Sequence, residues 1–180
     1  MNAMLHLKPL VHAILEDYAM PIDGTHGVAH WARVLEIGLR LAEETGANPE
    51  VIQLFAVFHD SRRINEGIDD GHGERGAELA AELLGKHFSL CDHDFDLLAT
   101  ACSLHTDGLT DADITIQTCW DADRLDLGRV GVMPMRQKLC TAAAKHPEII
   151  TWADGRAGFQ IVPERVREDW GIEIEAQRDW

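Results

Sequence analysis

The chain has few positive charges, with 16 Lys and Arg residues against 31 Asp and Glu residues among 180, a net charge of −15. Nucleic acids and anionic lipid surfaces are polyanions that attract basic proteins. No apolar run approaches the roughly 20 residues that span a bilayer. We therefore expect neither polymeric nucleic acid nor a membrane as a partner, and an anionic small molecule would need local positive charges.

Several common motifs are also missing. The four cysteines stand singly, without a CxxC pair, which argues against a zinc ribbon and a thioredoxin-type redox site. Neither a GxSxG nor a GxxxxGKS sequence occurs, which disfavours a covalent serine mechanism and ATP-driven activity. The first 20 residues lack a basic start and a small-residue cleavage site, so we expect no signal peptide and a cytoplasmic location.

Helical periodicity dominates the chain. Apolar residues recur at three- and four-residue spacings, and no segment alternates as a strand does. The sequence therefore predicts an all-α bundle, and its length favours a single domain over residues 1–180. Caps and turns place helices at residues 5–20, 25–45, 48–60, 74–84 and 92–105, from 114 through 123, from 134, and from 147. The polar stretch 61–73 is expected to be a surface loop, whereas residues 162–180 give no clear pattern.

Five polar residues end apolar stripes of these helices. His30 precedes Val34 and Ile37 at helical spacings, so it faces the core. The same alignment holds for His59, His72, His105 and Asp123.

Asp60 supplies an independent signal. A carboxylate at the end of a helix meets the negative end of the helix dipole, at a cost of about 0.3–1 kcal/mol. Burying that charge without a partner would cost several kcal/mol more. A divalent cation bound by His59 and Asp60 would remove both penalties, so this pair indicates metal ligands.

Three motifs occur in order on three predicted helices: His30 in HWARV, His59-Asp60 in FHD, and Asp123 in DADRLD. Together they resemble the His, His-Asp, Asp signature of the HD superfamily of metal-dependent phosphohydrolases, over about residues 23–128. This resemblance implies an all-α bundle that binds one divalent ion through those four residues. Such ligands accept Mn, Mg, Fe, Co, Ni or Zn.

Asp121 is the rival for the last ligand position. Two residues apart on a helix, Asp121 and Asp123 diverge by about 200°, so one of them can face the metal. We prefer Asp123 because the aspartate of the family immediately precedes an Arg-Leu pair.

His72 and His105 allow three interpretations. They could line the pocket beside one metal and protonate the leaving group, bind a second ion as in some members of the superfamily, or be core histidines. We favour the first, because the gap of 13 residues between His59 and His72 is short for a two-metal member. His26 is expected to cap a helix or contact the substrate.

Positive charge near the predicted ligands is the other requirement of phosphoryl chemistry. Arg33 lies one turn after His30, and the remaining candidates for anion binding are Arg62, Arg63 and Arg124. We therefore expect a phosphohydrolase in which metal-activated water attacks a small phosphoester such as a nucleotide. Catalytic roles are expected for Asp60, His72 and His105.

Two other functions stay open at this point: a two-metal, iron-dependent oxygenase and a metal-binding regulatory module without turnover. The apolar, tryptophan-bearing ends of the chain could pack on this domain or on a second copy, and we prefer a homodimer.

Overall fold

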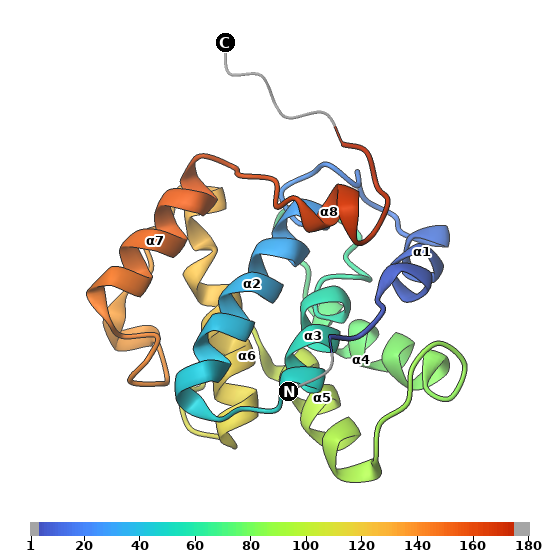
Figure 1. Ribbon diagram of the computed structural model, residues 1–180, viewed down its shortest axis with the longest axis horizontal. Coiled ribbons are helices and arrows are strands. Elements are labelled where there is room, and N and C mark those ends of the chain that lie inside the picture. Colours follow the sequence, from blue (N-terminus) through green and yellow to red (C-terminus); the bar gives the residue numbers. More distant parts are fainter. Residues whose placement is uncertain (1–3, 175–180) are drawn as a thin grey trace.

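The computed structural model describes residues 4–174 of the chain, which fold into a bundle of helices (Figure 1). Within this range there are eight α-helices and no strand, which confirms the predicted all-α class. The helices are α1 (Lys8–Glu16), α2 (Val28–Thr45), α3 (Pro49–Phe58), α4 (His72–Leu83), α5 (Asp92–Leu104), α6 (Ile114–Leu125), α7 (Pro147–Gly158) and α8 (Arg165–Glu168). Two 3-10 turns, η1 (Leu127–Val130) and η2 (Arg136–Lys138), follow α6. No helix in the described range is long and apolar enough to cross a membrane.

Helix α3 forms the centre of the bundle, as its apolar sequence predicts. Every residue from 51 to 58 is buried, and the helix packs against α2, α5 and α6. Its start is fixed by Asn48, whose side chain accepts a hydrogen bond from the amide of Glu50 (2.9 Å), and by Pro49 at the first helical position. Its last residue is Phe58, so His59 and Asp60 leave the helix inside the core.

Helix α4 approaches α3 and α5 closely because two of its residues are glycines. A Cβ atom on Gly73 would lie 2.3 Å from the carbonyl oxygen of Cys102, and one on Gly76 would lie 2.3 Å from that of Phe58. Such distances are far shorter than a van der Waals contact. The two glycines therefore let His72, the first residue of α4, reach the centre of the bundle.

Four segments differ from the sequence prediction. Helix α1 spans Lys8–Glu16 and is shorter at both ends than the predicted 5–20. Helix α2 begins at Val28 after a turn, so His26 precedes the helix. Helix α4 begins at His72, two residues earlier than expected. The helix predicted from residue 134 is wrong: this segment contains only the short turn η2, and the carboxylate of Asp121 accepts hydrogen bonds from the amides of Cys140 and Thr141 just after it.

Candidate metal centre

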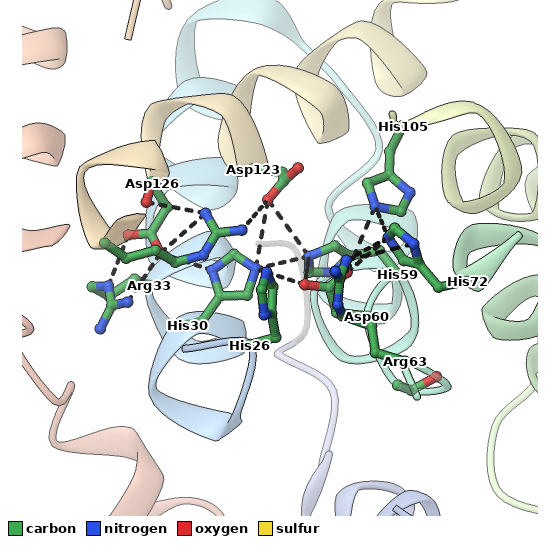
Figure 2. Close-up of polar contacts among 12 residues, drawn as sticks. His26, His30, Arg33, His59, Asp60, Arg63, His72, His105, Asp123 and Asp126 are labelled. Atoms are coloured by element: carbon green, nitrogen blue, oxygen red, sulfur yellow. Dashed lines mark hydrogen bonds and ion pairs between the residues drawn. The ribbon is translucent and has the colours of Figure 1, made fainter. Parts of the chain in front are cut away.

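Six side chains from five helices converge at the centre of the bundle (Figure 2). Their positions follow the ends of the helices: one lies in the first turns of α2, one begins α4, two follow α3, one follows α5, and one lies in the last turn of α6. They are His30, His59, Asp60, His72, His105 and Asp123. The side chain of Asp123 is 13% exposed and the others are almost fully buried.

The first group contains His30, His59 and Asp60 and is able to hold a metal ion. The Nε2 atoms of the two histidines lie 3.0 Å apart. Nε2 of His30 lies 3.4 Å from Oδ2 of Asp60. Oδ1 of Asp123 borders the same space, 3.5 Å from Nε2 of His30 and 3.7 Å from Nε2 of His59.

A second group with the same ability contains Asp60, His72 and His105. The two histidine Nε2 atoms are again 3.0 Å apart. Oδ1 of Asp60 lies 3.1 Å from Nε2 of His72 and 3.7 Å from Nε2 of His105. Asp60 therefore offers one carboxylate oxygen to each group.

Hydrogen bonds at the opposite ring nitrogens fix how the four histidines are protonated. Nδ1 of His30 donates to Oδ2 of Asp126 (2.7 Å), and Nδ1 of His59 donates to the carbonyl oxygen of Phe55 (3.1 Å). The other two rings do the same with backbone carbonyls, His72 with Asp69 (2.6 Å) and His105 with Cys102 (2.7 Å). These oxygens can only accept, so in a neutral ring the proton is on Nδ1 and Nε2 presents a lone pair.

Facing lone pairs require a positive charge between them. In each group two Nε2 atoms lie 3.0 Å apart, where two lone pairs repel. In addition, Oδ1 of Asp123 is buried without a hydrogen-bond partner among the described residues, which is costly for a carboxylate. Imidazole nitrogen and carboxylate oxygen are suitable ligands for divalent transition metals, so the donor set fits a metal ion.

The carboxylates of the cluster are held in the ionised form that binds metals. Burial opposes ionisation of Asp60, but the histidine rings that face it attract its negative charge whenever they are protonated, which outweighs burial and holds the pKa of Asp60 well below its usual range. Burial likewise opposes ionisation of Asp126, and hydrogen bonds from His30 and Arg33 lower its pKa overall.

Two residues beside the cluster were not identified from the sequence. Asp126 orients His30 and also accepts two hydrogen bonds from Arg33, at 2.7 and 3.0 Å. The guanidinium of Arg129 lies 3.5 Å from Oδ1 of Asp123. A signal was present for Asp126, because it is the last residue of the DADRLD motif and lies three residues after Asp123.

Two of the residues expected to bind substrate lie at the rim of the cluster. Nη1 of Arg63 is 3.6 Å from Oδ1 of Asp60 and 3.1 Å from Nε2 of His72. His26 packs edge-on against the ring of His30 and pairs with Glu66.

The remaining expected residues point elsewhere. Arg33 is engaged by Asp126, as described above. Arg62 donates to the carbonyl oxygens of Ile14 and Ser61, and Arg124 donates to those of Lys138 and Leu109. Asp121 accepts from Cys140 and Thr141, away from both histidine pairs, so the structure brings Asp123 rather than Asp121 to the cluster.

The fold and the site together describe an all-α protein with a candidate metal centre of buried histidine and aspartate side chains. The family model described as HD domain matches residues 27–128, more than half of the chain. The chain therefore belongs to the HD-domain family, and the matched range contains all six side chains of the cluster. Neither the curated proteins nor the solved structures contain a match. Family and site together indicate a metal-dependent function.

Proposed function

We propose that the protein is a metal-dependent phosphohydrolase that cleaves a small phosphoester such as a nucleotide. The observation that carries this proposal is the position of Asp60. One of its carboxylate oxygens faces the His30 and His59 pair, and the other faces the His72 and His105 pair. Bound divalent metal lowers the pKa of a coordinated water toward neutrality and supplies the nucleophile. The family match to an HD domain agrees with this chemistry.

The geometry favours two ions rather than the single ion expected from the sequence. His30, His59 and Asp123 would hold one ion, His72 and His105 the other, and Asp60 would bridge them. In this assignment the last two histidines are ligands instead of proton donors to the leaving group. The short loop between α3 and α4 does not prevent this, because the glycines of α4 bring His72 within 3.1 Å of Asp60.

Buried arginines supply the positive charge that the acidic chain lacks overall. Arg63 and Arg129 border the two ends of the cluster, and their side chains are 8% and 7% exposed. Fixed positive groups stabilise the charge that develops on a transferred phosphoryl group, and they act more strongly where water is excluded. We expect Arg63 to contact the reacting phosphoryl group.

The proposal is tested by metal analysis and turnover on one preparation. Protein purified without chelator should contain close to two divalent ions per chain and should hydrolyse members of a panel of nucleotides and sugar phosphates. His59→Ala should lose both metal and turnover, while Arg124→Ala, on the far side of α6, should keep both. Full metal content without hydrolysis of any phosphoester would contradict the proposal and point to a regulatory module.

A two-iron oxygenase is the second candidate, and the His72 and His105 pair specifically favours it because it completes a two-metal site. Iron as the dominant metal, together with substrate-dependent oxygen consumption, would support the oxygenase. Turnover that proceeds with Mn²⁺ under anaerobic conditions would support the phosphohydrolase.

A further inference from the structure

A small cavity lies beside the metal cluster, on the side formed by the start of α2. It is lined by the turn before α2 and by Ala29, Arg33, Arg129 and Gln160, among others. Its volume is about 60 Å³. By the same measure one water molecule needs roughly 10–15 Å³, so the cavity has the size of one phosphate group rather than that of a whole nucleotide.

Arg129 is a residue in the lining of this cavity whose side chain has hydrogen-bond donors without partners within residues 4–174. Its side chain is 7% exposed. Nη1 donates to the carbonyl oxygen of Asp126 (3.0 Å), and Nε has no partner among the described residues although it is buried. A guanidinium carries five N–H donors, and buried donors without partners are rare. Arg129 therefore lines the cavity with donors to spare, because within the described range Nη2 makes only the 3.5 Å contact with Oδ1 of Asp123.

Two carboxylates lie near the guanidinium of Arg129, Oδ1 of Asp123 at 3.5 Å and Oδ2 of Asp126 at 3.9 Å, and both also face other side chains. The carboxylate of Asp126 is shared by Arg33 and His30, and the third donor of Arg33 is used by the carbonyl oxygen of Ile161 (2.9 Å). Helix α2 adds partial positive charge, because the first amides of a helix lack intrahelical partners. Its N-cap, Gly27, has no side chain to satisfy them. The carboxylate in the lining, Asp23, belongs to an exposed residue of the turn.

We propose that Arg129 and the first turn of α2 form an anion-binding subsite that receives a second anionic group of the substrate. The inference rests on the proposed phosphohydrolase function and narrows its substrate class to phosphoesters with two anionic groups, such as nucleoside diphosphates or bisphosphates. Arg129 connects the two sites, because Nη2 lies 3.5 Å from Oδ1 of Asp123 while the same side chain lines the cavity. The second group would thus sit next to the metal ligands.

The subsite is tested first by binding of inorganic phosphate, measured by calorimetry on the full chain as purified and again after chelation. The expected result is a phosphate site that survives chelation, is weakened at least about ten-fold by Arg129→Met, and is weakened similarly by Ala29→Leu, which fills the cavity without changing any charge. Arg124→Met is the matched control and should bind phosphate as the wild type does. Phosphate binding that disappears completely on chelation, or that survives in both cavity variants, would overturn the proposal.

Steady-state kinetics then establish whether the bound anion is part of the substrate. ADP should be preferred over AMP, and the fructose bisphosphate over its monophosphate, by at least about ten-fold in kcat/KM in whichever of these pairs is hydrolysed. Ala29→Leu should abolish the preference mainly through KM, and inorganic phosphate should compete with the substrate. Phosphate binding that changes kcat without competing would overturn the assignment and identify a site for a free anion. Absence of all turnover with an intact phosphate site would count against the phosphohydrolase function and leave the anion site standing.

Discussion

Asp60→Asn removes the carboxylate that the two histidine pairs share while keeping the shape of the side chain. The amide has one accepting oxygen, and its NH₂ group donates hydrogen bonds but cannot bind a cation. Because Oδ1 faces His72 at 3.1 Å and Oδ2 faces His30 at 3.4 Å, the NH₂ group must replace a ligand of one pair whichever way the amide turns. Both pairs lose the negative charge. We expect the variant to lose most of its metal.

The size of the effect can be estimated from linkage. A ligand present at 100 times its Kd stabilises the folded state by about 2.7 kcal/mol. For a chain of this length, each kcal/mol corresponds to about 2–4 °C in Tm, so metal should raise the Tm of the wild type by about 5–11 °C. Asp60→Asn should lose this increase. Without metal, the variant should be less stable than the wild type, because the depressed pKa of Asp60 means that its negative charge stabilises the folded state at neutral pH.

Thermal unfolding with excess Mn²⁺ and after chelation, together with metal analysis, measures both effects. The matched control is Asp121→Asn, because Asp121 is equally buried but accepts its hydrogen bonds from Cys140 and Thr141. This control should lose about 1–3 kcal/mol of stability with and without metal and keep the metal-induced increase in Tm. If metal raised the Tm of Asp60→Asn as much as it raises that of the wild type, the assignment of Asp60 as the shared ligand would be refuted.

Three further changes probe the supports of the site. Asp126→Asn should lower metal affinity about 10–100-fold because His30 loses its orienting acceptor. His30 and Arg33 depress the pKa of Asp126, so the stability that its carboxylate contributes is present above about pH 4 and is lost as the pH falls. The stability of the variant should therefore depend less on pH below that value. A loss of stability in acid as steep as that of the wild type would contradict this. Gly73→Ala should push α5 away through the carbonyl oxygen of Cys102 and lower the metal count toward one per chain; two tightly bound ions would show that α4 and α5 tolerate the change. Gln160→Gly should raise stability by about 1 kcal/mol, seen as a higher Tm, because Gln160 has a φ of 50°, which glycine adopts without strain; a lower Tm would mean that the Gln160 side chain makes contacts worth more than the strain.

The positions of site residues that lie on a helix, or directly at its end, could be predicted from the sequence. His30 sits on an apolar stripe of α2, and His59 and Asp60 end the most apolar helix of the chain, so local periodicity was enough to turn them inward. The sequence then predicted that these side chains meet in one cluster, because buried polar groups on several helices need each other, or a shared ion, as partners. The HD-domain match covers the same residues.

Residues outside regular helices could not be predicted in this way. Arg62 and Arg63 are neighbours in the loop after α3, yet only Arg63 reaches the cluster, which depends on backbone turns that no periodicity encodes. Arg129 lies in the 3-10 turn η1, beyond the end of α6, so the helical pattern that identified Asp123 stops before reaching it. The helix predicted from residue 134 fails for a related reason, because a carboxylate 19 residues earlier takes the amide of Cys140.

The directions of the helices explain why cation ligands and an anion cavity can lie side by side. The C-terminal ends of α3 and α5 point at the cluster, and their last carbonyls, including those of Phe55 and Cys102, accept from histidine Nδ1 atoms. Helix C-termini carry partial negative charge, which favours a bound cation, whereas the N-terminus of α2 carries partial positive charge and faces the cavity. Arg129 lies between the two regions, 3.5 Å from Asp123. A substrate phosphate in the cavity would therefore meet positive charge from both the helix and the arginine, while the reacting phosphate faces the cluster.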